Sequence, residues 1–236
     1  YEWYLQYIEE AEGTNNFYAE FGKFCHKILE MYAKGELGLF ELSDYFVAHY
    51  DEEVKEFVYH KTADIRENYK QKAIEYFDNI DIDFGKYEIL GIEKKCDFEI
   101  NGYKFTGYID LLLREKDTNI VLIDHKSSKY PYGKKGKLLK SEKDKFQQYK
   151  RQLYLYSIQV FNEYGVFPDR IGWNYFGDRK WDFLDFNKED YEEAKKWAID
   201  TLEEVRNTSE FPPTVDFYYC HNLCKFRNSY CEYKNY

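Results

Sequence analysis

GYIDLLL at residues 107–113 and VLIDHK at residues 121–126 decide the fold of this chain. Both runs are strongly apolar and bounded by charged or turn residues, which favours two neighbouring β-strands. Asp110 lies in the first run, and Asp124 lies near the end of the second. Lys126 follows Asp124 by two residues and therefore projects from the same face of an extended strand.

These three ionisable residues predict a metal site for phosphodiester hydrolysis. Asp110 and Asp124 offer the hard oxygen ligands that Mg²⁺ and Mn²⁺ prefer. A cation held there activates water, and the ammonium group of Lys126 stabilises charge on the phosphate. A carboxylate among leucines is costly to bury unless it is paired or binds a metal. A salt bridge between Asp124 and Lys126 at a strand edge is the alternative interpretation.

The composition is compatible with a single aromatic-rich domain. The 236 residues can bury a sizeable core, and 26 Tyr and 19 Phe predict that much of it is aromatic. No run of 18 apolar residues occurs, so we expect no membrane-spanning helix. The chain begins YEWY, without Met or a signal peptide, so we expect a truncated start. The five cysteines, three of them near the C-terminus, favour metal ligation in a reducing compartment such as the cytoplasm.

The net charge of −10 is unusual for a protein that binds nucleic acid, but the basic residues are clustered. Residues 129–145 contain seven lysines and begin three residues after Lys126. We expect Lys134, Lys135 and Lys137 in this segment to neutralise a phosphate backbone. A solvated, flexible loop is the alternative.

Periodicity in the sequence predicts a mixed α/β core that follows an N-terminal helical region. Helices are expected over residues 1–11, 17–33, within 40–80, 142–163 and from Asn187 to about 205. Strands are expected over residues 87–100, 103–114, 120–124, 170–176 and 181–186, with turns at Asn101-Gly102 and at residues 117–119.

Three further residues have a spacing that suits a nucleic-acid site. Gln152 and Tyr156 are four residues apart in the helix predicted after the lysine-rich segment, so they share one face. Gln can bond phosphate or base edges and Tyr can stack on a base, although an ordinary amphipathic helix shows the same pattern. His26 is a candidate ligand in the helix over residues 17–33, where a buried, satisfied histidine is the commoner case.

Together these motifs resemble the RecB-like branch of the PD-(D/E)XK nuclease superfamily. That branch includes the CRISPR-associated adaptation nuclease and the nuclease domains of recombination helicase–nucleases. The resemblance rests on four motifs that occur in the branch's order, namely the histidine helix at residues 22–30, Gly107–Asp110, Asp124–Lys126 and Gln152–Tyr156.

The resemblance implies a role for each matching residue. His26, Asp110 and Asp124 would bind the catalytic metal, with help from the backbone carbonyl of His125, whose imidazole we expect on the opposite face of its strand. Lys126 would serve the attacking water. Gln152 and Tyr156 would contact DNA, and Glu93 stands where relatives often carry a glutamate.

The resemblance also implies the fold and the activity. We expect a restriction-endonuclease-like α/β core at residues 87–207, a helical region at 1–86 and a cysteine-rich segment at 208–236, forming one nuclease domain. The expected activity is Mg²⁺- or Mn²⁺-dependent hydrolysis of DNA, as an exonuclease on single strands or DNA ends, in recombination, repair or phage DNA processing. A helicase, recombinase or integrase is the kind of partner expected in a bacterial or phage-encoded system.

The C-terminal cysteines resemble those of iron–sulfur members of the branch. Cys220, Cys224 and Cys231 would hold a [4Fe–4S] cluster with a fourth cysteine that we expect upstream of Tyr1, although both spacings are one residue longer than the commonest pattern. Structural zinc held with His221 is the second interpretation, and reduced free cysteines are the third.

Two other functions stay open from the sequence. A catalytically silent module with this fold could still bind DNA or take part in an assembly, although Asp110, Asp124 and Lys126 are all present. An enzyme that cleaves RNA would need the same three residues, and nothing in the motifs separates the two substrates.

Overall fold

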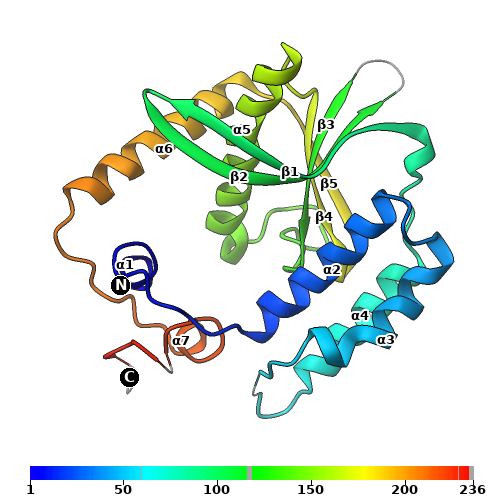
Figure 1. The fold of residues 1–236 in the computed structure, drawn as a ribbon, viewed down its shortest axis with the longest axis horizontal. Coiled ribbons are helices and arrows are strands. Elements are labelled where there is room, and N and C mark those ends of the chain that lie inside the picture. Colours follow the sequence, from blue (N-terminus) through cyan, green and yellow to red (C-terminus); the bar gives the residue numbers. More distant parts are fainter. Residues whose placement is uncertain (59, 116–118, 228, 234–236) are drawn as a thin grey trace.

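The computed structural model describes residues 1–58, 60–115, 119–227 and 229–233. A five-stranded mixed sheet is flanked by helices, and further helices lie beyond one end of it (Figure 1). The helices are α1 (Glu2–Tyr7), α2 (Phe17–Ala33), α3 (Leu42–Glu53), α4 (Ile65–Asp78), α5 (Lys143–Tyr164), α6 (Lys188–Asn207) and α7 (Phe217–Asn222). The strands are β1 (Tyr87–Ile100), β2 (Tyr103–Glu115), β3 (Ile120–Lys126), β4 (Arg170–Tyr175) and β5 (Lys180–Asp185). None of these helices is long and apolar enough to cross a membrane.

The sheet follows the chain order β1-β2-β3-β4-β5, and only β3 and β4 are parallel among its neighbours. Parallel strands need a crossover connection, which α5 provides. Asn101 and Gly102 join β1 to β2 with φ angles of 52° and 84°. Two left-handed residues at this position define the tight hairpin turn that Asn-Gly favours, so the expected hairpin is confirmed. The turn expected at residues 117–119 lies mostly outside the described residues.

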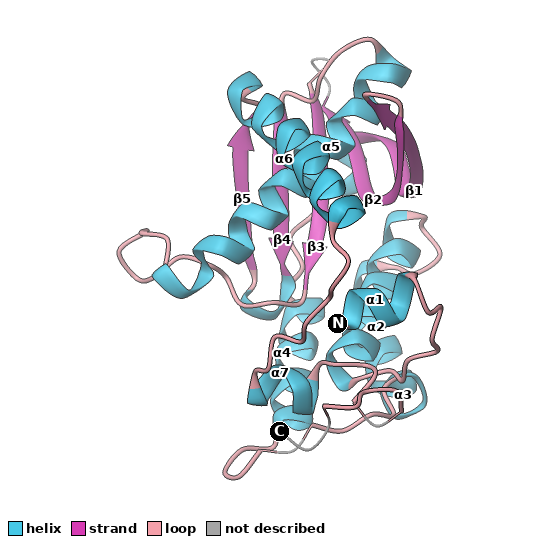
Figure 2. Ribbon diagram, turned by 90° about the vertical axis from the view of Figure 1, so that its left-hand side faces the viewer, coloured by secondary structure: helices cyan, strands magenta, loops and turns pink. Residues whose placement is uncertain are grey.

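Helices α5 and α6 cover one face of the sheet, as Figure 2 shows. Alternation along the strands divides the side chains between the two faces. Leu112 and Leu122 pack toward the helices, whereas Leu111 and Ile123 belong to a smaller cluster on the other face. The aromatic core expected from the composition is present around Trp173, which is fully buried.

Helices α2, α3 and α4 form a second core, which we call the helical lobe, beside the α/β core of residues 87–207. Its buried side chains are mainly aromatic: Phe17, Phe21, Phe24, Phe46, Tyr50, Tyr76 and Phe77. Phe176, directly after β4, is buried in the same cluster and so connects the helical lobe to the sheet. This contact places α2 against the end of the sheet where β3 stops.

Most observed elements agree with those predicted from the sequence. Helix α2 spans the predicted residues 17–33, and the side chain of Asn187 caps α6 by accepting a hydrogen bond from the Asp190 N–H at 3.0 Å. Strand β3 is longer than predicted because its parallel pairing with β4 continues to Lys126, opposite Tyr175. Both Asp124 and Lys126 are therefore held by sheet hydrogen bonding.

Candidate active site

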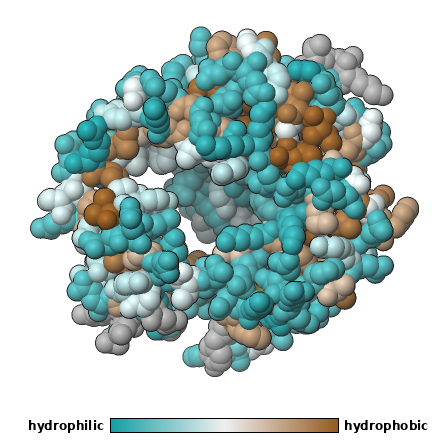
Figure 3. Space-filling model, viewed as in Figure 1, coloured by the Kyte–Doolittle hydropathy of each residue, from teal (hydrophilic) through white to brown (hydrophobic). Residues whose placement is uncertain are grey.

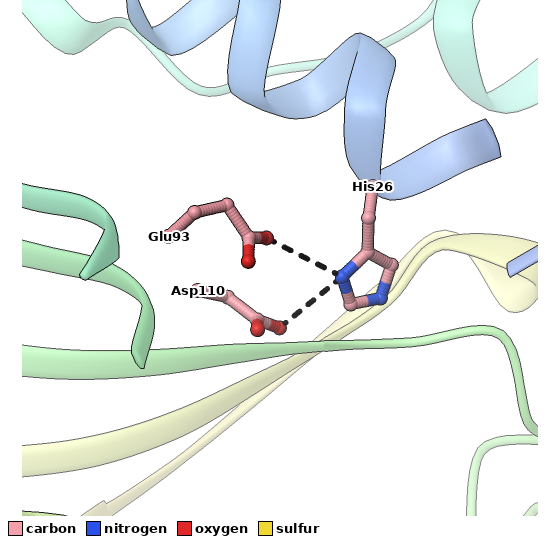
Figure 4. Close-up of side chains that lie close together, drawn as sticks. All are labelled: His26, Glu93 and Asp110. Atoms are coloured by element: carbon pink, nitrogen blue, oxygen red, sulfur yellow. Dashed lines mark ion pairs between the residues drawn. The ribbon is translucent and has the colours of Figure 1, made fainter. Parts of the chain in front are cut away.

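Strands β1 and β2 bring two carboxylates together at an irregular point of the hairpin. The register pairs Ile92 with Leu111 and Lys94 with Ile109, which places Glu93 opposite Asp110. Glu93 has a φ angle of 44°, in the left-handed region that costs a residue with a side chain about 1–2 kcal/mol. The carboxylate of this residue points toward the histidine of α2 (Figure 4).

Helix α2 supplies that histidine. Nδ1 of His26 lies 3.5 Å from Oδ2 of Asp110 and 3.8 Å from Oε1 of Glu93. Among the described residues, these three are the one group whose ligand atoms all lie within 4.8 Å of each other, a spacing that can hold a metal ion. The structure therefore brings together two predicted ligands and adds Glu93, which the sequence suggested only through resemblance.

Asp124 and Lys126 lie next to this group on β3. The Lys126 Nζ lies 2.5 Å from Oδ2 of Asp124, as expected for side chains on one face of a strand. Both side chains are largely buried, with exposed fractions of 6% for Asp124 and 14% for Lys126. The ion pair that the sequence suggested as the alternative interpretation therefore forms, and it lies in a largely buried site, where Coulomb interactions are strong.

Two residues of α5 hold the lysine from the other side. Oε1 of Gln152 accepts a hydrogen bond from Lys126 Nζ at 3.1 Å, and the Gln152 amide donates to the Tyr156 hydroxyl at 3.2 Å. Gly107 leaves room for this tyrosine, because a Cβ atom at Gly107 would lie 2.6 Å from the Tyr156 hydroxyl. The glycine, the glutamine and the tyrosine of the motifs thus form one connected unit that ends at Lys126.

Tyr149, also on α5, was not selected from the sequence. Its ring lies under Lys126 Nζ, with 4.0 Å between the ammonium nitrogen and the ring centroid. This is cation–π geometry, which stabilises a partly desolvated ammonium by about 1–2 kcal/mol. Its hydroxyl donates to Ser128 Oγ at 3.2 Å. Only its position three residues before Gln152, on the same helix face, could have suggested this role.

His125 is anchored on the opposite side of β3, as expected from strand alternation. Its imidazole is buried, and Asn174 Nδ2 lies 3.0 Å from its Nδ1 and 2.7 Å from the Tyr76 hydroxyl. Its backbone N–H donates to Oδ2 of Asp110 at 2.6 Å. Burial lowers the pKa of His125 well below its usual value, so the ring is neutral. Asn174 and Tyr76 therefore fix the peptide unit next to the carboxylates.

The acidic groups repel one another in the absence of a cation. Burial, together with the charge of Asp124, raises the pKa of Asp110 to about 7. Burial also raises the pKa of Asp124, although Lys126 opposes the shift. Burial lowers the pKa of His26, but Glu93 and Asp110 outweigh it and the net shift is upward. All three shifts come from carboxylates confined in a buried site, which a bound cation would relieve.

The donor set fits a divalent metal ion of the hard type. It consists of carboxylate oxygens and one imidazole, with no sulfur, which suits Mg²⁺ or Mn²⁺. Oδ2 of Asp124 is a further buried carboxylate oxygen, and it is ion-paired with Lys126 at 2.5 Å. Asp124 could act as a further ligand beside His26, Glu93 and Asp110 if a cation replaced this contact.

The lysines of the lysine-rich segment after β3 are exposed. No described carboxylate forms an ion pair with any of its seven lysines, which are Lys129, Lys134, Lys135, Lys137, Lys140, Lys143 and Lys145. By contrast, Lys150 and Arg151 on α5 pair with Asp190 and Glu193 on α6. Seven lysines without an ion-pair partner among the described residues therefore lie in the segment that directly follows Lys126.

The three C-terminal cysteines line one cavity of about 510 Å³ together with Tyr1 and Tyr219. Each is partly buried, and their thiols are not bridged. Their sulfur atoms do not meet the 4.8 Å spacing found for His26, Glu93 and Asp110. The cavity thus joins the first residue of the chain to Cys220, Cys224 and Cys231.

The family model of the PD-(D/E)XK nuclease superfamily matches residues 1–236. The chain therefore belongs to the PD-(D/E)XK nuclease superfamily, and its mixed sheet is the restriction-endonuclease-like core expected from the sequence. No curated protein matches the chain. The superfamily makes the protein a member of a class of nucleases that act on DNA with divalent metal ions.

Proposed function

We propose that this protein is a Mg²⁺- or Mn²⁺-dependent deoxyribonuclease that degrades single-stranded DNA or DNA ends. The observation that carries the proposal is the convergence of His26, Glu93 and Asp110 beside the Asp124–Lys126 pair. Carboxylates and a lysine held around one point are what phosphodiester hydrolysis needs. A merely structural salt bridge would not require a histidine and two further acidic groups at the same place.

Different residues of the site have different roles in the proposed reaction. His26, Glu93, Asp110 and Asp124, with the carbonyl of His125, would hold the cation. When bound, the cation would lower the pKa of water and neutralise phosphate charge. Lys126 would donate to the phosphate as negative charge develops on it, and Gln152 with Tyr149 would keep its ammonium group in place.

The lysine-rich segment supports the proposal that DNA is bound beyond the bond that is cleaved. Lys134, Lys135 and Lys137 are exposed and have no carboxylate partner in the described part of the chain, so they can neutralise a phosphate backbone. Contacts of Gln152 and Tyr156 with DNA stay a prediction, since in this structure the two side chains bond to Lys126 and to each other.

For the cysteine cavity we propose a [4Fe–4S] cluster held by Cys220, Cys224 and Cys231, with zinc as the second choice. Tyr1 lines the same cavity, so a cysteine directly ahead of it in a longer chain would reach these three thiols. Absorbance in the visible range and the iron and zinc content of anaerobically purified protein separate the two metals. A reducing cytoplasm, bacterial or phage-infected, would keep the thiols competent.

The proposal is tested with end-labelled DNA and RNA strands of the same sequence, incubated with Mn²⁺ or with EDTA. We expect degradation of the DNA in Mn²⁺ only. Cleavage of RNA alone would change the substrate class. Binding of DNA without cleavage, by metal-replete protein, would favour the non-catalytic binding module. A role in recombination or repair would then be tested by assaying the protein together with a helicase, recombinase or integrase.

A further inference from the structure

Helix α2 borders a cavity that adjoins the candidate metal site. The cavity has a volume of about 370 Å³, and Glu93 of β1 lines it on one side. The residues of α2 that line it are Gly22, Lys23, His26, Lys27 and Glu30. Because His26 and Glu93 are two of the three candidate ligands, a molecule in the cavity would lie next to the bound cation.

The lining of this cavity suits a charged ligand. Apart from Gly22, every side chain that lines it is ionisable, so an uncharged apolar molecule would find little complementary surface. The space-filling view shows the surface hollowed between α2 and the β1–β2 hairpin, with mainly hydrophilic residues on the α2 side of the hollow (Figure 3). The sign of the ligand's charge then depends on which of the ionisable groups are already paired within the protein.

Lys23 lies at the turn of α2 that passes the end of β3. It precedes His26 by three residues, so the two side chains are neighbours on one face of the helix. A Cβ atom at Gly22 would lie 3.4 Å from Oγ of Ser127, the residue that follows Lys126. Lys23 is therefore close both to the metal site and to the start of the lysine-rich segment.

The ion pairs around the cavity leave Lys23 as its available positive charge. Lys27 pairs with Glu53 of α3, with 2.6 Å between Nζ and Oε1. Glu30 pairs with Lys34 at 2.5 Å. No carboxylate in the described part of the chain forms an ion pair with Lys23, whose side chain is exposed. Of the two lysines that line the cavity, Lys23 is thus the one that can pair with a ligand.

A bound cation would make the charge of Lys23 a surplus at this site. Three carboxylates are present, those of Glu93, Asp110 and Asp124, and a divalent ion together with Lys126 would balance them. The ammonium group of Lys23 would then attract an anion into the cavity. The phosphate groups of a DNA strand are the anions that the proposed reaction brings to this place.

We infer that the cavity holds a phosphate of the bound DNA strand, beside the one that is cleaved, and that Lys23 contacts it. The inference rests on the proposed nuclease function and deepens it, because it names a residue that fixes the strand on the α2 side of the metal. Lys126 is largely buried between β3 and α5, whereas Lys23 is exposed on α2, so the two lysines approach the strand from different elements.

The test measures how salt weakens the binding of a short single strand of DNA in Mn²⁺, with Lys126→Ala as the parent protein so that the strand stays intact. Adding Lys23→Ala should lower the affinity about fivefold at 0.1 M salt and reduce the slope of log affinity against log salt by ~0.7, as expected for one phosphate contact on a single strand. Lys23→Arg keeps the charge and should retain most of the affinity. Thermal unfolding of each variant reports on folding.

Lys27→Ala is the matched control, because Lys27 lines the same cavity but is paired with Glu53. It should leave the affinity and the slope close to those of the parent. A strand in which every linkage is a neutral methylphosphonate should bind Lys23→Ala and the parent equally, since it offers no phosphate charge.

Three results would overturn the inference and leave the proposed nuclease intact: an unchanged slope in Lys23→Ala, an equal loss in Lys27→Ala, or a difference between Lys23→Ala and the parent that persists on the neutral strand. Absence of DNA binding by the parent and by the wild type, even at low salt, would overturn the proposed function and the inference with it.

Discussion

The ammonium group of Lys126 donates a hydrogen bond to the side-chain carbonyl of Gln152 over 3.1 Å. The same amide donates to Tyr156, whose ring lies against Gly107. Sequence motifs that lie some 45 residues apart along the chain therefore meet as one unit around the proposed catalytic lysine. In this arrangement Gln152 positions Lys126 directly.

Replacement of Gln152 separates positioning of the lysine from contact with DNA. Gln152→Leu should lower kcat by about 10- to 100-fold, because a small displacement of a catalytic group has effects of this size. KM for a DNA strand should change little. Gln148→Leu, at an exposed position of the same helix, is the control. A large rise in KM with unchanged kcat would show that Gln152 acts through DNA contact.

Two substitutions of Tyr149 separate the role of its ring from the role of its hydroxyl. Tyr149→Phe keeps the aromatic face under Lys126 and removes only the hydroxyl that bonds to Ser128, so its activity should stay close to that of the wild type. Tyr149→Leu removes the face and should lower kcat about tenfold, which corresponds to a cation–π contribution of ~1.4 kcal/mol. Equal losses in both variants would point to the hydroxyl instead.

The contact between Gly107 and Tyr156 predicts that substitutions at these two positions have non-additive effects on the free energy of unfolding. Gly107→Ala alone would place a Cβ atom 2.6 Å from the tyrosine hydroxyl. Overpacking of this kind should lower the free energy of unfolding by about 1–3 kcal/mol. In a Tyr156→Ala background the same change should cost much less, as urea unfolding of the four proteins would show. Additive losses would mean that the two residues do not interact.

The raised pKa of Asp110 contributes to the pH dependence of stability in the metal-free protein. Its pKa is about 7 in the folded protein, whereas the ordinary value for an aspartate is 3.8. Between these two pH values the folded state therefore binds more protons than the unfolded state. Stability from this carboxyl therefore falls as pH rises from 3.8 to about 7. His26, whose pKa is also raised, loses its contribution in the same direction, above pH 6.5.

Metal binding should reverse this trend, because ligands must be deprotonated to bind. Affinity for Mn²⁺ should increase up to about pH 7, with proton release that calorimetry in two buffers can measure. Asp110→Asn should weaken Mn²⁺ binding and flatten the fall in unfolding free energy. An equal change of unfolding free energy with pH in the wild type and in Asp110→Asn, both in EDTA, would contradict the assigned shift.

The strands and long helices could be predicted because each has a strong local signal. Asn101-Gly102 specifies the hairpin turn, and Asn187 caps α6 through its own side chain. The extent of β3 was underestimated because it depends on parallel pairing with β4, a strand that follows some 44 residues later. Pairing between distant strands has no local signal in the sequence.

The site was predictable where residues are related by strand or helix periodicity. Asp124 with Lys126, and Gln152 with Tyr156, follow directly from spacings of two and four residues. The positions of Glu93, Tyr149 and Asn174 depend instead on how β1, α5 and β4 pack around the site. The sequence alone does not show that Glu93 has a left-handed backbone within a strand. It also does not separate Tyr149 from the many other tyrosines of the chain.

Lys126 and its neighbouring metal ligands are proposed to hydrolyse DNA. The most direct test is degradation of an end-labelled linear strand in Mn²⁺ by the wild-type protein, Lys126→Ala and Lys129→Ala, the last being an exposed lysine three residues further along. We predict cleavage by the wild type and Lys129→Ala, and none by Lys126→Ala with unchanged DNA binding. Full cleavage by Lys126→Ala would contradict a role of Lys126 in hydrolysis.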